Sequence, residues 1–138
     1  KLIALAQECG KIDDPVIRQE IARLHSLVEI TMWHMGRMKS GAAATGGEGN
    51  LAKIRNSQMT VLARDLGNAI IGMHATVTGE SSMTGGDVQE MTLFSPAPSI
   101  YGGTDQVQRN IIGERVLGLP KEPGSPRDTP FKELLHNR

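Results

Sequence analysis

Apolar side chains recur every three or four residues along two long stretches of the chain, which is the spacing of one face of an α-helix. The first stretch follows Asp14 and Pro15, an acidic N-cap ahead of a proline at the first helical position, and predicts an amphipathic helix of about seven turns. The second stretch starts at Asn50 and is expected to end near residues 77–79. The apolar positions are Ile17, Ile21, Leu24, Val28, Met32, Met35 and Met38 in the first stretch, and Leu51, Ile54, Met59, Leu62, Leu66, Ile70 and Met73 in the second.

Shorter segments lie before, between and after these two predicted helices. The first residues carry an apolar helical pattern with no capping residue ahead of it, which is typical of the end of a helix, so we expect the chain to be the C-terminal part of a longer one. Residues 40–49 hold four glycines and no sizeable apolar side chain, and they predict a flexible connection. Residues 79–98 combine Gly, Ser, Thr and two prolines without a sustained period, and they predict a long loop.

A third helix is predicted for residues 104–117, with Gly118 and Pro120 as stop signals. Few alternating β-branched residues occur anywhere, so the fold class is all-α: an antiparallel four-helix bundle whose first helix is truncated. We expect this domain to span residues 1–119 and a proline-rich, extended tail to span residues 120–138. The inward positions of the third helix are predicted as Val107, Ile111, Ile112 and Val116, and the tail prolines are Pro120, Pro123, Pro126 and Pro130.

Composition narrows the possible functions. Fifteen basic and fifteen acidic residues give zero net charge and only four residues are aromatic, so no nucleic-acid partner is expected. No apolar run approaches the roughly 20 residues that span a bilayer, so no membrane span is expected. Cys9 is the single cysteine and cannot form an internal disulfide, which favours a cytoplasmic protein. No metal site is predicted, because the helical histidines are too far apart for a short motif. The five methionines at helical spacing are interpreted as core filling: Met32, Met35, Met38, Met59 and Met73.

Residues 99–120 carry the densest local signal. Gly102 and Gly103 leave the backbone free to approach a ligand, and Thr104 is suited to cap the helix that follows. The exposed amides and the positive end of the helix dipole favour an anion or a carbonyl oxygen. Spacing alone does not separate this interpretation from a plain tight turn into a capped helix.

The run YGGTDQVQRNII, followed by ERVLGLP, resembles the C-terminal signature of the acyl-CoA dehydrogenases. The resemblance extends backward through residues 14–19 and the two long helices. It implies the C-terminal helical domain of an FAD-dependent enzyme that oxidises an acyl-CoA substrate between its α and β carbons. It also implies an electron-accepting flavoprotein as partner and a homo- or hetero-oligomer, either a dimer or a tetramer.

Matched position by position, the resemblance implies that Thr104 and Gln106 contact FAD and that the backbone of Gly103 helps to hold the thioester carbonyl. Tyr101 matches a residue that lines the acyl pocket. A partly buried tyrosine that only packs against the bundle is an equal alternative for Tyr101. All four residues lie within residues 101–106.

Two departures from the family pattern bear on function. Gly102 stands where many family members carry the glutamate that removes the α-proton, so the base lies upstream of Lys1 or the subunit is a non-catalytic member of a hetero-oligomer that completes a partner's FAD site. Ala69 and Met73 stand where the family often has a glutamine and a glycine that contact the FAD of a neighbouring subunit, and Lys11 is the nearest match to a family arginine. An unrelated helical interaction module is the remaining alternative.

Overall fold

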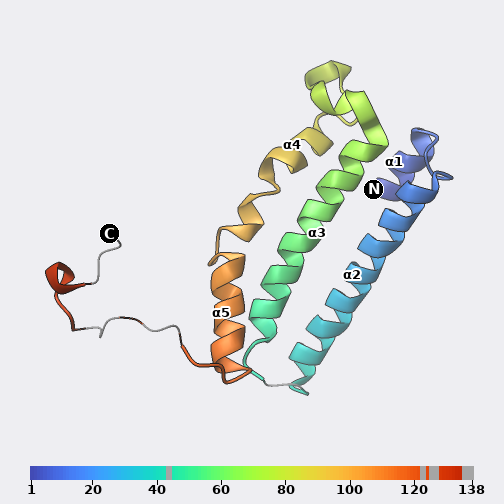
Figure 1. Ribbon diagram of the computed structural model, residues 1–138. Coiled ribbons are helices and arrows are strands. Elements are labelled where there is room, and N and C mark those ends of the chain that lie inside the picture. Colours follow the sequence, from blue (N-terminus) through green and yellow to red (C-terminus); the bar gives the residue numbers. More distant parts are fainter. Residues whose placement is uncertain (43–44, 122–123, 125–127, 135–138) are drawn as a thin grey trace.

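The computed structural model describes residues 1–42, 45–121, 124 and 128–134, and the regular elements within those residues are helical (Figure 1). Figure 1 labels the α-helices α1 Leu2–Glu8, α2 Pro15–Ser40, α3 Glu48–Ile71, α4 Asp87–Phe94 and α5 Asp105–Arg115. Short 3-10 turns occupy η1 Gly72–Thr76, η2 Gly79–Ser81, η3 Ala97–Ser99 and η4 Phe131–Glu133.

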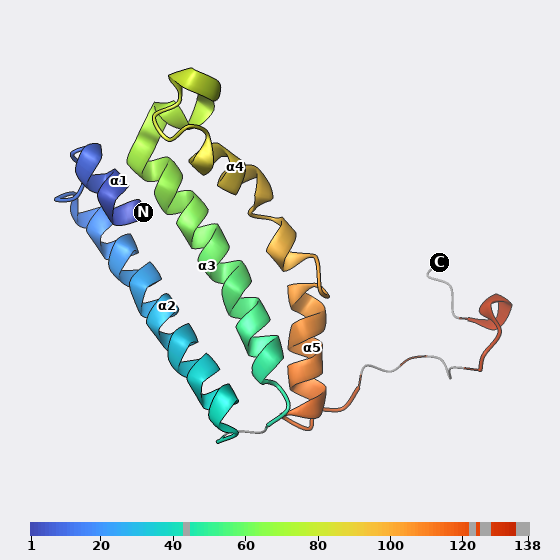
Figure 2. The same cartoon turned by 180° about the vertical axis from the view of Figure 1, so that it is seen from behind.

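Helix α3 is the centre of the bundle. Helix α2 runs antiparallel to it on one side, and α4 and α5 follow one another along its other side (Figures 1 and 2). The short α1 packs against the end of α3 that lies beside the start of α2. The predicted all-α antiparallel bundle with a short first helix is therefore confirmed, with α4 and α5 together as its fourth member. The buried apolar core lies where α1, α2, α3 and α4 meet and consists of Ala6, Ile17, Leu66, Ile70, Ile71 and Val88.

Helix α2 begins and ends at the residues that its flanking sequence predicts. The Asp14 carboxylate accepts hydrogen bonds from the backbone N–H groups of Val16, at 2.8 Å, and Ile17, at 3.2 Å. Gly41 ends the helix in a left-handed conformation, φ 70°, and its N–H donates to the carbonyl of Met38. Both ends thus satisfy backbone groups that a helix leaves unpaired.

Helix α3 begins two residues before the predicted start, at Glu48. One carboxylate oxygen of Glu48 accepts hydrogen bonds from the backbone N–H and the hydroxyl of Thr45, at 2.6 and 2.8 Å. A methyl group added at Gly47, just ahead of the helix, would come within 2.6 Å of the Val116 side chain. The absence of a side chain at Gly47 therefore allows the start of α3 to lie close to the end of α5. Residues 43–44 of the predicted connection lie outside the described residues.

Helix α3 also ends earlier than predicted, at Ile71 rather than near residues 77–79. Gly72 adopts φ 58° and ψ −129°, which breaks the α-helix and leads into η1. The ammonium of Lys11 donates to the carbonyl of Ala69 at 2.8 Å and so satisfies an oxygen of the last turn. The apolar period reaches Met73, but that side chain is 86% exposed and does not extend the buried face.

The prediction of a long loop over residues 79–98 is wrong, because α4 lies within it. This helix buries Val88 and also a polar side chain, Gln89, whose amide donates to the carbonyls of His74 and Val77, both at 2.8 Å. Eight residues are too few to display a clear apolar period, and a buried glutamine hides it further.

Helix α5 confirms the third predicted helix, and Thr104 is its N-cap. The predicted inward position of Val107 is wrong, since Val107 is 47% exposed and the neighbouring Gln108 is buried instead. In the predicted extended tail, η4 is a helical turn rather than extended chain, whereas Pro123 and Pro126 lie outside the described residues.

The interpretation of the methionines as core filling is wrong for four of them. Exposed fractions are 61% for Met32, 50% for Met35, 41% for Met38 and 86% for Met73. The first three lie in the C-terminal half of α2, beyond the part of the bundle that α1 covers (Figures 1 and 2). Their apolar period is therefore a true helical face that the described chain leaves uncovered.

Candidate functional site

The turn between α4 and α5 brings the predicted site residues together. After η3, the backbone N–H groups of Ile100 and Tyr101 both donate to the carbonyl of Ala97, at 2.9 and 3.0 Å. Gly102 and Gly103 then adopt φ 63° and 86°, in the left-handed region that favours glycine. At Gly103 an added methyl would also lie 2.8 Å from the amide nitrogen of Gln108, so any side chain there would displace that amide.

The first turn of α5 presents polar groups outward from this turn. The Thr104 hydroxyl oxygen accepts from the backbone N–H of Val107 at 3.2 Å, which leaves the hydroxyl hydrogen available to donate. Gln106 is exposed, and its side chain makes no hydrogen bond to another of the described residues. The expected cap is confirmed, and the positive end of the helix lies beside both side chains.

A row of polar side chains on α3 holds this turn in place. We call Asn50, Lys53 and Ser57 the α3 polar row, since they lie at successive turns along one face of the helix. The Ser57 hydroxyl lies 3.0 Å from the carbonyl oxygen of Pro98 and 2.9 Å from Oδ1 of Asp105. Lys53 Nζ lies 2.7 Å from the same Asp105 oxygen. The row therefore binds both the entry to the turn and the start of α5.

Asn50, the remaining residue of the α3 polar row, is linked to Gly102 through the side chain of Gln108. The Asn50 side-chain amide donates to Oε1 of Gln108, and Gln108 Nε2 donates to the carbonyl of Gly102 at 2.8 Å. Gln108 is only 7% exposed, so this pair of hydrogen bonds is largely shielded from water. Shielding makes the bonds costly to break, because an unpaired buried amide loses its solvation without compensation.

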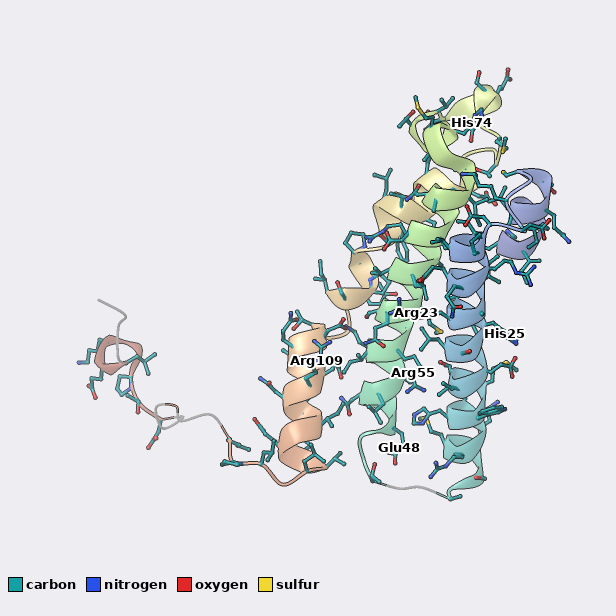
Figure 3. All side chains as sticks on the ribbon, turned by 45° about the vertical axis from the view of Figure 1, so that its right-hand side comes forward. Arg23, His25, Glu48, Arg55, His74 and Arg109 are labelled. Carbon is teal, nitrogen blue, oxygen red and sulfur yellow. The ribbon has the colours of Figure 1, made fainter. Side chains whose placement is uncertain are left out.

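Asp105 is a carboxylate near the turn, but its partners occupy it. Burial by itself would raise the pKa of Asp105, yet the hydrogen bonds from Lys53 and Ser57 and the positive charges of Lys53 and Arg109 outweigh burial and hold it below its ordinary value of 3.8. Figure 3 shows Arg109 on α5, the helix that Asp105 begins. The carboxylate is thus ionised at neutral pH and already paired, which makes it a poor proton acceptor.

Tyr101 lies between the turn and an apolar groove. Its ring is 52% exposed and tilted by 42° to the ring of Phe94, with the ring centroids 6.4 Å apart. Phe94 in turn lines a groove of about 700 Å³ between α1 and α4. The apolar side chains that line this groove with Phe94 include Leu2, Leu5, Met83, Val88 and Met91, and its charged residues are Lys1, Glu8, Asp87 and Glu90.

The described part of the chain shows neither a metal site nor a membrane-spanning helix. His25 on α2 and His74 near the end of α3 lie far apart along the bundle (Figure 3). Among residues 1–42, 45–121, 124 and 128–134, no three His, Cys, Asp or Glu side chains are placed to hold a metal ion. No helix among those residues is both long and apolar enough to cross a membrane.

A sequence model of the acyl-CoA dehydrogenase C-terminal domain matches residues 5–117, which is most of the chain and includes the whole turn. The chain belongs to the acyl-CoA dehydrogenase family. Within this family it is 35% identical, over 122 residues, to acyl-CoA dehydrogenase IpdE1 of Mycobacterium tuberculosis, a match that covers 88% of this chain and 31% of that protein. It is 29% identical over 118 residues to acyl-CoA dehydrogenase FadE26 of the same organism, covering 80% of this chain and 30% of that protein.

A solved structure agrees with the fold. The crystal structure of the ChsE4-ChsE5 complex from Mycobacterium tuberculosis superposes with a TM-score of 0.72 over 88% of this chain and 36% of that one, at 23% identity. The chain therefore spans about a third of the length of the proteins that it matches.

Sequence reasoning found the turn but missed the residues that hold it. In the sequence, Lys53 is one of several polar residues off the apolar face of the predicted helix, and Asn50 marks only the start of that helix. The available signal was the spacing of Asn50, Lys53 and Ser57, which places three polar side chains on one face of the predicted helix.

Proposed function

We propose that this chain is the C-terminal domain of an FAD-dependent acyl-CoA dehydrogenase, and that residues 101–106 supply part of the flavin and thioester site. The observation that carries the proposal is the turn itself. Its outward hydrogen-bond donors, on Thr104 and Gln106, lie within the family motif at the positive end of α5. The α3 polar row and Gln108 hold the backbone of the turn through hydrogen bonds. Residues 1–119 form this domain in the proposal, with residues 120–138 as a separate tail.

The donor set of the turn fits a flavin cofactor. FAD offers carbonyl oxygens, ring nitrogens, hydroxyls and a pyrophosphate, all of which accept hydrogen bonds. Thr104 and Gln106 supply a hydroxyl and an amide that face outward, and the missing side chain at Gly102, where an added methyl would meet nothing within 4 Å, leaves the backbone of the turn open to a ligand. When bound, FAD supplies the acceptor for the hydride equivalent that leaves the β-carbon of the substrate.

The substrate in this proposal is an acyl-CoA thioester. The N–H of Gly103 donates a hydrogen bond to the thioester carbonyl and so stabilises the negative charge that develops on that oxygen when the α-proton leaves. Tyr101 and the groove beyond Phe94 present an apolar surface of the kind that an acyl chain requires. Fatty-acid metabolism in the cytoplasm, with an electron-accepting flavoprotein and assembly into an oligomer, completes the proposal.

The base that takes the α-proton does not come from this turn. Gly102 has no side chain, and the nearby carboxylate of Asp105 is committed to Lys53 and Ser57. A working enzyme therefore places its base in the part of the protein that precedes Lys1. Gly102 equally favours a second candidate function, that of a non-catalytic subunit which completes the FAD site of a partner in a hetero-oligomer.

An anaerobic titration of the full-length protein with a panel of acyl-CoA thioesters tests both candidates. Bleaching of the visible flavin band would support a working dehydrogenase, and the most effective thioester would identify the substrate class. Bound flavin that no thioester bleaches would favour the non-catalytic subunit. A full-length protein that takes up no flavin, alone or with its partner subunit, would contradict the proposal.

A further inference from the structure

We propose that the outward face of α3 binds the same face of a second copy of this chain, with the two α3 helices antiparallel and Arg55 of each copy opposite Asp65 of the other. This inference rests on the proposed function only in its expectation of an oligomer, and it does not depend on flavin. The face carries six side chains, which we call the α3 outer row: Leu51, Arg55, Gln58, Leu62, Asp65 and Ala69.

The α3 outer row lies on a side of the helix that the described bundle leaves open. Leu51 is 42% exposed, three more members of the row are exposed, and the other two are half-buried. Gly67 comes two residues after Asp65 and therefore faces nearly the opposite side of α3. A methyl group added at Gly67 would lie 3.1 Å from Met91, so α4 covers that opposite side. Helix α1 shares a groove with α4, so a segment that continues α1 does not cover the row.

The spacing of the row is that of a seam between two packed helices. Successive members are separated by four, three, four, three and four residues, the repeat that lets one helix follow another along its length. From Leu51 to Ala69 the row extends over about five helical turns, or about 27 Å. A seam of this length fits a partner helix rather than a small ligand.

The row is symmetrical about residue 60, and its charges are arranged to attract an identical copy. Arg55 and Asp65 each lie five residues from that centre. A second copy related by a two-fold axis through the centre, and running antiparallel, therefore places Arg55 opposite Asp65 twice. A parallel copy would place like charges opposite each other and would be repelled. At the ends of the antiparallel row, Leu51 lies opposite Ala69, so a large side chain meets a small one.

Both charged groups can make this contact. Arg55 lies on α3 (Figure 3), and among the described residues its side chain has neither an ion pair nor a hydrogen bond. Asp65 is 59% exposed, and its Oδ1 accepts from Nε of Arg64 at 2.8 Å. No described residue donates a hydrogen bond to Oδ2 of Asp65, so this oxygen can accept from the guanidinium of a second copy.

A groove of about 410 Å³ beside the centre of the row gives the second copy an apolar contact. Its apolar walls are Leu27 of α2 and Val61 and Leu62 of α3. Because the two-fold axis passes through residue 60, the central side chains of the second copy, Gln58 and Leu62, meet this groove. An apolar centre flanked by charged pairs is the usual arrangement of a protein–protein interface.

Charge reversal in the full-length protein tests this inference. Arg55→Glu places a carboxylate opposite Asp65 at both contacts, and Asp65→Arg places a guanidinium opposite Arg55 at both. We expect each variant to lose one step of assembly, from tetramer to dimer or from dimer to monomer. The dissociation constant of that step, measured by sedimentation equilibrium, should rise at least about tenfold.

A mixture of the two variants separates this pairing from a general loss of stability. One copy of each variant restores opposite charges at both contacts, so the mixture should regain the step that neither variant makes alone. A variant that carries both substitutions should regain it too. Arg18→Glu, the same charge change at an exposed residue of α2 outside the row, is the control and should leave assembly unchanged. Far-ultraviolet circular dichroism verifies the helices of each variant.

The possible results are distinct. Loss of one assembly step in each single variant, with recovery in the mixture, supports the inference. Unchanged assembly in both single variants, or a loss that the mixture does not reverse, overturns it. An unmodified protein that is monomeric, or that assembles only with a different subunit, also overturns it. Flavin content is measured on the same samples, and an unmodified protein that assembles without taking up flavin contradicts the proposed function while leaving this inference standing.

Discussion

Thr104 caps α5 and is also proposed to contact FAD, and substitutions at residues 104 and 106 can distinguish these two roles. Thr104→Val removes the helix cap, which lowers the free energy of unfolding by about 1 kcal/mol. It also removes the hydroxyl proposed to contact FAD, and we expect the affinity of the flavin-free full-length protein for FAD to fall about tenfold, the effect of losing one hydrogen bond. Titration of that protein with FAD, monitored by quenching of flavin fluorescence, measures the second effect.

Gln106→Ala and Thr104→Ser are the matched comparisons. The Gln106 side chain has no hydrogen bond to another described residue, so its removal should weaken FAD binding without changing the unfolding midpoint. Thr104→Ser keeps the hydroxyl and should change neither property. Unaltered FAD affinity in both Thr104→Val and Gln106→Ala would show that these residues are not cofactor contacts.

Asp105 should make the protein's stability depend on pH at the acid end. Its pKa in the folded state lies below 3.8, so the carboxylate contributes its full stabilisation above that pH, and the contribution is lost as the pH falls through the lower folded-state pKa. Asp105→Asn leaves Lys53 without its charged partner and should lower the free energy of unfolding by about 2 kcal/mol at neutral pH.

Thermal unfolding of the full-length protein between neutral pH and pH 3 measures this dependence. The difference in midpoint between Asp105→Asn and the unmodified protein should shrink as the pH falls below 3.8. Asp13→Asn is the control, because Asp13 is 92% exposed and its ion pair with Arg18 is of the surface type that contributes little. A difference that stays constant across the acid range would show that Asp105 stabilises the fold through shape rather than charge.

The residues of the turn could be predicted from the sequence because they are contiguous. A glycine pair, a capping threonine and the start of a helix each leave a local mark, and these marks stand together in residues 101–106. The residues that hold the turn lie at distances of 41 to 58 positions along the chain, where no local rule connects them. A polar residue in a helix looks solvated until the element that covers it is known, and Lys53 is such a residue.

At the scale of elements, glycines distinguish close packing from open surface. A methyl group at Gly47 would meet the Val116 side chain at 2.6 Å, whereas a methyl at Gly49, two residues later, would meet nothing within 4 Å. Gly47→Ala should therefore force α3 and α5 apart and lower the free energy of unfolding by about 1–3 kcal/mol. Gly49→Ala should raise it by about 0.5–1 kcal/mol, because alanine favours the helix.

Urea unfolding of the two variants compares these effects directly, and the double variant Gly47→Ala, Val116→Ala adds a test of mechanism. Shortening Val116 makes room for the new methyl, so the double variant should recover part of the stability lost in Gly47→Ala. Equal changes in Gly47→Ala and Gly49→Ala would contradict the close approach of the two helices.

Helix boundaries show why element prediction succeeded in some places and failed in others. The start of α2 carries two local signals, Asp14 and Pro15, and the structure begins the helix at that proline. The end of α3 is decided by the backbone conformation of Gly72 and by Lys11, which arrives from a distant loop. Helix α4 exists because Val88 and Gln89 find partners on neighbouring elements, and no eight-residue pattern reveals such partners.

At the scale of the whole molecule, one apolar face of α2 is only partly covered by the described residues. Ile17, Ile21 and Leu24 pack on or within the core that includes Ala6 of α1. Val28, Met32 and Met35 continue the same helical face, but they are 39%, 61% and 50% exposed. Helix α1 is about 10 Å long and α2 about 39 Å, so α1 covers only the first part of that face.

We expect a helix that precedes Lys1 in the full-length protein to continue α1 along this face and cover Met32 and Met35. The family members matched by this chain are about three times as long, which leaves ample chain for such a helix. Thiol labelling in a Cys9→Ser background measures the cover: Met32→Cys should react at least about tenfold more slowly than Ser26→Cys, which lies on the opposite side of α2, because a buried thiol is reached only when the packing opens. Equal labelling rates would mean that the face stays open in the full-length protein and would contradict the predicted cover.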